Sequence, residues 1–135
     1  MSAVVVDDDR LLLVRRGRGR AQGRWALPGG RVEHGELLVE AVLRELAEET
    51  GVDAVCGPLL GVVELLADTG EGPVGPMPHQ VVLVHRADVI DPVEPVAGDD
   101  AAEARWVPLA DVVDLALVDG LAEFLHDHQV IATIT

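Results

Sequence analysis

The chain has 135 residues, of which 49% are hydrophobic, and it carries a formal net charge of −14 at pH 7. This length fits a single domain spanning residues 1–135, which can bury roughly two thirds of its unfolded surface. The acidic charge argues against nucleic-acid binding, which needs a basic surface, and no apolar run approaches the ~20 residues of a membrane span.

The first part of the chain predicts a β-hairpin and a short third strand. Apolar runs indicate strands at residues 3–6 and 11–15, joined by an acidic turn at residues 7–9. Residues 16–23 are rich in glycine and arginine, and we expect them to form a loop. A short strand is expected at residues 24–27.

A helix is expected at residues 37–50, which contain no proline or glycine and are rich in good helix formers. Gly51 follows at the position of a left-handed helix cap. At about 100° per residue, five apolar side chains share one helix face and form the predicted buried stripe: Leu38, Val39, Val42, Leu43 and Leu46.

Three carboxylates lie beside this stripe. Glu45, Glu48 and Glu49 have the spacing i, i+3, i+4, so their side chains meet on one surface. They repel each other and occupy the helix end where the dipole disfavours negative charge. One interpretation is a solvated acidic face; the other is a site for Mg²⁺, which prefers carboxylate oxygens, substrate phosphates and water.

The second half of the chain predicts more strands and a second helix. Gly57-Pro58 is expected to separate two strands, and the glycine- and proline-rich loop at residues 67–78 is a candidate for substrate specificity. The elements suggest a mixed sheet with a helix on each side. In chain order the expected elements are strands 52–56, 59–66 and 80–89, a polar loop 91–101, a strand 103–107, a helical turn 111–115, a helix 119–127 and an apolar tail 130–135.

The segment around the first helix resembles the signature of the Nudix hydrolases. Residues 30–52 read GRVEHGELLVEAVLRELAEETGV and match, at every specified position, G-x5-E-x7-R-E-U-x-E-E-x-G-U, where U is aliphatic. Residues 25–30 read WALPGG, and many Nudix proteins carry W-x-L-P-G-G there. The resemblance runs from about Val4 to about Leu125 and implies an α/β fold, the Nudix α/β/α sandwich, with the motif helix packed on a mixed sheet.

The resemblance also implies a set of metal ligands and catalytic residues. Glu45, Glu48 and Glu49 correspond to the family's ligands, and the Gly29 carbonyl commonly completes the coordination. The position of Glu45 is most often argued to be the general base in the MutT-type branch, so Glu45 and Glu48 are the candidate catalytic glutamates. Arg44 is expected to orient them through ion pairing.

A further acidic ligand usually comes from a later loop. Asp100 lies six residues before Trp106, where MutT-type proteins place such a carboxylate. Asp99 and Glu103 are the alternatives, although Glu103 can equally be an edge-strand residue next to Arg105.

The arginines are the candidate substrate ligands. All ten positive residues are arginines, and seven of them lie in the first 31 residues, so a positive segment faces the acidic helix. Arg16 aligns with a phosphate- or substrate-contacting arginine, and Arg24 and Arg31 are further candidates. For Arg18 and Arg20 a solvated surface loop is an equally good interpretation.

The expected function is Mg²⁺-dependent hydrolysis, with Mn²⁺ as the alternative cofactor, of the pyrophosphate bond in a nucleoside diphosphate linked to another moiety. The segment GDDAAEARWVPL at residues 98–109 resembles small ADP-ribose pyrophosphatases. A MutT-type pyrophosphohydrolase of oxidised nucleoside triphosphates is the close alternative, and a non-catalytic nucleotide sensor is a third.

We expect a small nucleotide as the only partner class, with neither nucleic acid nor membrane, and a homodimer as in many relatives that act on ADP-ribose. A single cysteine and no signal-peptide pattern make the cytoplasm the default location.

Overall fold

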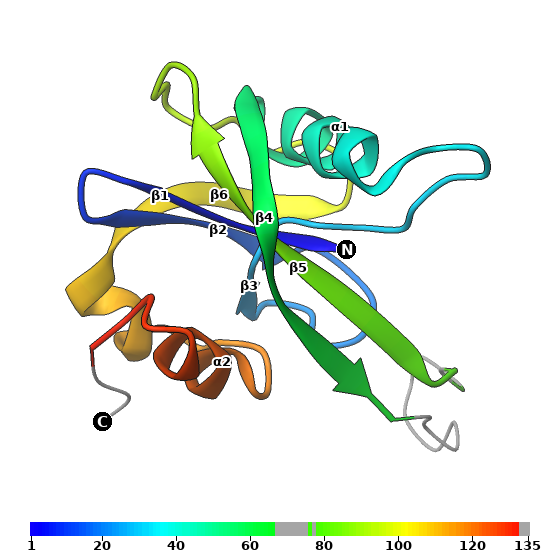
Figure 1. The fold of residues 1–135 in the computed structure, drawn as a ribbon. Coiled ribbons are helices and arrows are strands. Elements are labelled where there is room, and N and C mark those ends of the chain that lie inside the picture. Colours follow the sequence, from blue (N-terminus) through cyan, green and yellow to red (C-terminus); the bar gives the residue numbers. More distant parts are fainter. Residues whose placement is uncertain (67–75, 77, 133–135) are drawn as a thin grey trace.

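The computed structural model describes residues 1–66, 76 and 78–132, so most of the predicted specificity loop at 67–78 lies outside the described residues. Six strands and one long helix carry the fold, with a 3-10 helix and a short second helix near the end (Figure 1). In chain order the elements are β1 Ser2–Asp7, β2 Arg10–Arg16, β3 Trp25–Ala26, α1 Leu38–Thr50, β4 Ala54–Leu65, β5 Gln80–Val89, β6 Ala101–Pro108, the 3-10 helix η1 Leu109–Asp114 and α2 Leu121–Asp127.

The strands form one mixed, curled sheet. Its order is β3-β2-β1-β5-β4, and β6 pairs with β2. The pairing of β1 with β5 is parallel, whereas the β1–β2, β2–β6 and β4–β5 pairs are antiparallel. The segment after β3 continues along β1, where the Ala3 amide donates to the Pro28 carbonyl at 3.0 Å. This pairing places the Gly29-Gly30 turn at the start of β1.

The two faces of the sheet bury alternate residues, as the two-residue period of a strand requires. On one face Ala3 and Val5 pack with Val42 and Leu46 of α1. On the other face Val4 packs in a second cluster that includes Leu121 and Leu125 of α2. Helices therefore cover opposite faces, and the predicted α/β/α sandwich is confirmed (Figure 1).

Two local predictions were wrong. Residues 54–65 form one continuous strand across Gly57-Pro58, because β5 supplies partners on both sides and a bulge absorbs the irregularity. Leu38 and Val39 are exposed, since residues 38–40 at the start of α1 lie free of the sheet and burial begins at Ala41.

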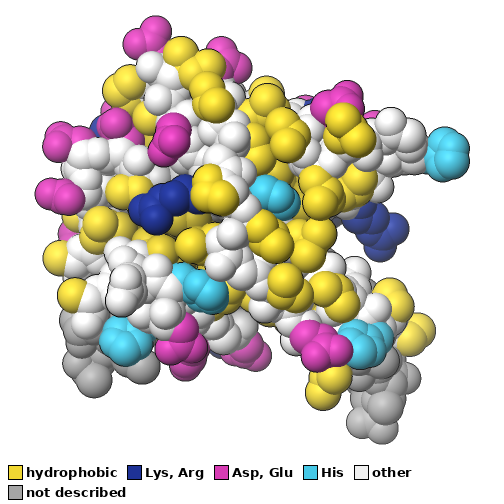
Figure 2. Space-filling model, viewed as in Figure 1, with side chains coloured by type: hydrophobic (Ala, Val, Ile, Leu, Met, Phe, Trp, Pro, Cys, Tyr) yellow, Lys and Arg dark blue, Asp and Glu magenta, His cyan; other side chains and the backbone are white. Residues whose placement is uncertain are grey.

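The outer surface of the β4–β5 ribbon is apolar. Figure 2 shows hydrophobic side chains gathered over these strands, and Val55, Val62 and Val81 are among the exposed ones. Among the described residues, no helix is long and apolar enough to cross a membrane.

Candidate metal site and active centre

The C-terminal half of α1 presents its three glutamates at different depths. Glu45 and Glu49 are buried on the helix flank and Glu48 is exposed. The helix ends at Gly51, whose φ of 71° is left-handed and whose amide donates to the Ala47 carbonyl at 3.0 Å, as the sequence predicts. This sharp end leaves the last turn of α1 free to meet other loops.

The Gly29-Gly30 turn packs directly against the two buried glutamates. The Gly29 amide donates to Glu49 Oε1 at 2.9 Å. A Cβ built on Gly30 would lie 2.3 Å from Glu45 Oε1, which is closer than non-bonded atoms approach. Glycine at position 30 therefore lets the backbone contact the Glu45 carboxylate.

A fourth carboxylate comes from the loop between β5 and β6, residues 90–100, called here the Asp99 loop. Its amides satisfy carbonyls at the end of α1: Val96 donates to Thr50 at 2.9 Å, and Gly98 donates to Glu49 at 3.0 Å. A Cβ on Gly98 would lie 2.3 Å from the Glu48 carbonyl oxygen, so only glycine allows this close approach. Asp99 follows with a φ of 52°, which directs the chain out of this contact.

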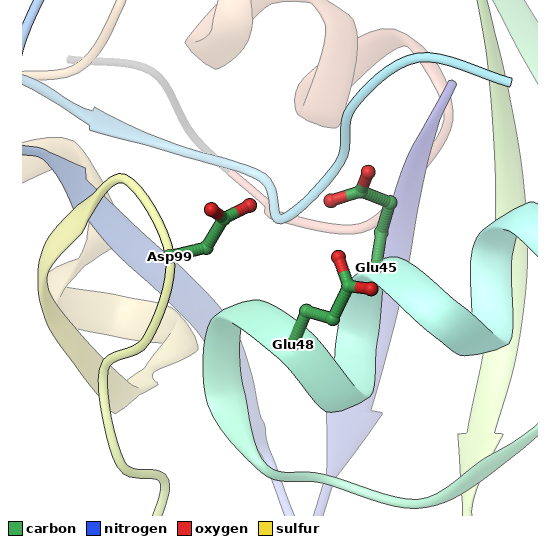
Figure 3. Close-up of side chains that lie close together, drawn as sticks. All are labelled: Glu45, Glu48 and Asp99. Atoms are coloured by element: carbon green, nitrogen blue, oxygen red, sulfur yellow. The ribbon is translucent and has the colours of Figure 1, made fainter. Parts of the chain in front are cut away.

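Glu45, Glu48 and Asp99 converge as a result (Figure 3). One carboxylate oxygen of each lies within 4.8 Å of the others. Three hard oxygen donors at this spacing are the donor set that Mg²⁺ takes in proteins, so these residues fit a divalent cation. Glu49 lies deeper and holds the Gly29 amide instead.

Asp100 and Glu103, the other late-loop candidates, have partners elsewhere. The Asp100 carboxylate forms an ion pair with Arg18. Glu103 contacts Arg15 at 3.4 Å and Arg105 at 3.3 Å. Of the three candidates, only Asp99 joins the group of carboxylates described above.

Arg44 links the glutamates to the turn before the helix. Its Nε and one terminal nitrogen bind the two oxygens of Glu36 at 2.7 and 3.0 Å. Its other terminal nitrogen donates to Glu45 at 2.9 Å and to Glu48 at 3.1 Å, and a further bond reaches the Arg31 carbonyl at 2.9 Å. The hydrogen bonds that Arg44 donates to Glu36 and Glu45 raise the pKa of Arg44, and Arg44 in turn lowers the pKa of Glu36. Both groups therefore stay charged.

Glu49 is a buried carboxyl group with a raised pKa. Burial, together with the charges of Glu45 and Asp99, raises its pKa from the ordinary 4.5 to about 8, against the opposing hydrogen bond from the Gly29 amide. Without a cation, Glu49 therefore holds a proton at neutral pH, because a second buried negative charge beside Glu45 is unfavourable.

The predicted substrate arginines line the edges of the β2–β3 loop and the Gly-Gly turn. Arg16 Nε donates to the Arg20 carbonyl at 2.7 Å, and an Arg24 terminal nitrogen donates to the Leu117 carbonyl at 3.0 Å. The Arg31 carbonyl accepts from Arg44, and its side chain is exposed. The sequence did not predict that Gly17 packs against the Asp100 carbonyl or Gly98 against the Glu48 carbonyl. The only signals were a glycine immediately before Asp99-Asp100 and another in the arginine-rich loop.

A family model described as NUDIX domain matches residues 1–128 of the chain. Among curated proteins, the chain is 39% identical over 116 residues to a protein of Methanocaldococcus jannaschii named ADP-ribose pyrophosphatase. That alignment covers 86% of this chain and 64% of the archaeal protein, so the chain spans somewhat less than two thirds of that relative's length.

Solved structures share the fold. A MutT NUDIX hydrolase from Burkholderia pseudomallei is 31% identical with a TM-score of 0.73, and the match covers 93% of this chain and 92% of that one. The NUDIX domain of Shewanella oneidensis NrtR, solved in complex with ADP ribose, is 26% identical with a TM-score of 0.68; that match covers 98% and 86% of the two chains.

Proposed function

Because the chain belongs to the Nudix family of hydrolases, we propose that it is a Mg²⁺-dependent enzyme that cleaves the pyrophosphate bond of a nucleoside diphosphate linked to another moiety. The observation that carries this proposal is the convergence of Glu45, Glu48 and Asp99 from two separate segments. A sensor without activity has no need of an intact acidic cluster with its arginine and glycine contacts.

Glu45, Glu48 and Asp99 would hold the cation, with Mn²⁺ as an alternative to Mg²⁺. Glu49 is a further ligand once it loses its proton, and the Gly29 carbonyl stays a predicted ligand. When bound, the cation neutralises phosphate charge and makes nearby water more acidic. We place Asp99 in the role first expected for Asp100, since Asp100 pairs with Arg18.

Glu45 is the proposed general base. Its carboxylate is buried, is held by Arg44 at 2.9 Å and packs against Gly30, so it has little freedom to move. In the proposed step a water oxygen attacks one phosphorus, its proton passes to Glu45, and the bond from that phosphorus to the bridging oxygen breaks. The leaving phosphate keeps the bridging oxygen. A fixed base is what such a step needs, because the attacking water must be oriented as it is deprotonated.

Arg44 is a proposed positioning residue. It spans Glu36, Glu45 and Glu48 with a planar set of donors, which only arginine supplies. The predicted substrate ligands are still three arginines: Arg16, Arg24 and Arg31. Their position around the loops that flank the carboxylates supports this role.

An ADP-ribose-like substrate is the preferred class. The name of the archaeal relative and the ligand of the NrtR domain both favour it. The chain contains only three aromatic residues other than histidine, which disfavours a strong stacking clamp on the base. Hydrolysis of nucleoside triphosphates is the second candidate, supported by the MutT protein that matches nearly all of the chain.

The purified protein should be incubated with Mg²⁺ and a panel of ADP-ribose, sugar nucleotides, dinucleotides, NTPs and dNTPs, and the products identified by mass spectrometry. We expect ADP-ribose to yield AMP and ribose 5-phosphate. Preferential conversion of triphosphates to monophosphates and pyrophosphate would favour the second candidate. Tight binding of one compound with no turnover would contradict the enzyme proposal.

Two further predictions concern the state of the protein. A homodimer is expected, and light scattering on the purified chain measures its mass directly. A cytoplasmic location is expected, and cell fractionation tests it.

A further inference from the structure

The loop between β2 and β3, residues 17–24, touches the Asp99 loop through its backbone. The Gly17 amide donates to the Asp100 carbonyl at 3.0 Å, and a Cβ on Gly17 would lie 2.6 Å from that oxygen. The next residue, Arg18, is therefore fixed at the edge of the carboxylate cluster, one residue from this contact.

Arg18 forms an ion pair with Asp100 at the protein surface. Its side chain is 77% exposed and that of Asp100 is 58% exposed. Exposed pairs of this kind contribute little, and breaking one weakens an equilibrium by at most about fivefold. The Arg18 guanidinium is thus free to exchange this carboxylate for a stronger anionic ligand.

A cavity of about 300 Å³ lies between the two loops. Its lining residues are Gly17, Arg18, Asp99, Asp100, Ala101 and Ala102. Asp99 of the proposed cation site and Arg18 of the β2–β3 loop therefore line the same cavity. Asp99 favours a cation and Arg18 favours an anion, and both line one space that is large enough for a phosphate group.

We propose that this cavity is a phosphate subsite, in which Arg18 binds the phosphate that the cation does not hold and Asp100 is an internal competitor for Arg18. This inference rests on the proposed function. A guanidinium binds two phosphate oxygens at once, and such charge-assisted hydrogen bonds are roughly twice as strong as neutral ones. Substrate therefore displaces Asp100, and the ion pair re-forms when product leaves.

Arg18 is better placed for this role than two of the predicted arginines. Arg16 Nε is held by the Arg20 carbonyl, and a terminal nitrogen of Arg24 is held by the Leu117 carbonyl. Those hydrogen bonds occupy side-chain donors of Arg16 and Arg24 with backbone carbonyls of the fold. The Arg18 bond uses a carboxylate, which has the same charge as the phosphate it would exchange for.

The test is a double-mutant cycle on binding of α,β-methylene-ADP, a diphosphate with a P–C–P bridge, by calorimetry in Mg²⁺. We expect Arg18→Gln to weaken binding about tenfold or more. Asp100→Asn should tighten binding by up to about fivefold, because the competitor is gone. The double variant should bind like Arg18→Gln, since Asp100 acts only through Arg18.

Three results would overturn the inference: no binding of the diphosphate by the wild type, unchanged binding by Arg18→Gln, or equal tightening by Asp100→Asn with and without Arg18. The last result would mean that Asp100 only repels the anion. Mn²⁺ affinity, measured by paramagnetic resonance, should stay constant in all three variants, and a loss in Asp100→Asn would make Asp100 a metal ligand instead. As a control, Asp7→Asn removes a carboxylate at the end of β1 that is paired with Arg10, and it should change nothing.

Failure of this inference is distinguishable from failure of the proposed function. If the wild type hydrolyses ADP-ribose but Arg18→Gln binds the diphosphate equally well, only the subsite is wrong. If the wild type hydrolyses no compound of the panel, the proposed function fails whatever the binding cycle shows.

Discussion

Gly29 and Gly30 are adjacent in the sequence, yet alanine at each should damage a different property of the protein. Neither glycine has a positive φ, so the effect of the added methyl group is steric. At Gly30 the new Cβ would lie 2.3 Å from Glu45 Oε1 and 2.7 Å from Oε2. At Gly29 it would lie 2.1 Å from the Met1 carbonyl oxygen and 2.8 Å from Ser2 Cα, which are backbone atoms.

The magnitudes follow from what must move. In Gly30→Ala the end of the Glu45 side chain must retreat by about 1 Å, and a misplacement of that size lowers catalysis about 100-fold. The free energy of unfolding should fall by only about 1 kcal/mol, the strain of one displaced side chain. In Gly29→Ala the start of β1 must separate from the turn, and such overpacking destabilises by about 1–3 kcal/mol.

Urea unfolding, thermal unfolding and steady-state kinetics with ADP-ribose distinguish the two cases. Gly30→Ala should unfold near the wild-type midpoint with kcat/KM reduced about 100-fold. Gly29→Ala should melt roughly 3–10 °C lower. If Gly30→Ala keeps wild-type kcat/KM, the position of the Glu45 carboxylate does not matter for catalysis and the reasoning is refuted.

Three further results are expected. Glu48→Gln should lower kcat about 100-fold or more in Mg²⁺, because it removes a charged ligand oxygen; wild-type turnover would contradict the site. Arg44→Lys should lower kcat about tenfold with little change in KM, since lysine keeps the charge but cannot bridge Glu36, Glu45 and Glu48. In EDTA, Glu49 has a pKa of about 8 in the folded protein, against 4.5 in the unfolded chain. Its contribution to the free energy of unfolding is therefore complete below pH 4.5 and is lost as the pH rises through 8. Urea unfolding from pH 5 to 9 should show this loss in the wild type and not in Glu49→Gln; identical profiles would contradict it.

The sequence predicts best what local interactions determine. The helix expected at 37–50 is found at Leu38–Thr50, and its glycine cap is found at Gly51. Helix propensity, spacing and capping all act within a few residues, so the carboxylates and their neighbours could be read from one segment. Strand propensity is also local, and β5 is found at the expected residues 80–89.

Long-range contacts decide which late-loop aspartate joins the glutamates and where β4 ends. The spacing to Trp106 favoured Asp100, whereas the structure brings Asp99 beside Glu45 and Glu48, because neighbouring residues of a loop point in different directions. The choice depends on Gly98 docking against the end of α1, a contact between residues 49 positions apart. Pairing with β5 likewise carries β4 through Gly57-Pro58, where local turn propensity favours a break.

Glu45, Glu48 and Asp99 lie close enough together to form one divalent-cation site, as we propose. Direct titration with Mn²⁺ by paramagnetic resonance tests it most simply, with Asp100→Asn as the control beside Asp99→Asn. We expect at least one Mn²⁺ site per chain, with an affinity lowered tenfold or more by Asp99→Asn and unchanged by Asp100→Asn. Equal Mn²⁺ affinity in the wild type and Asp99→Asn, or a loss only in Asp100→Asn, would contradict it.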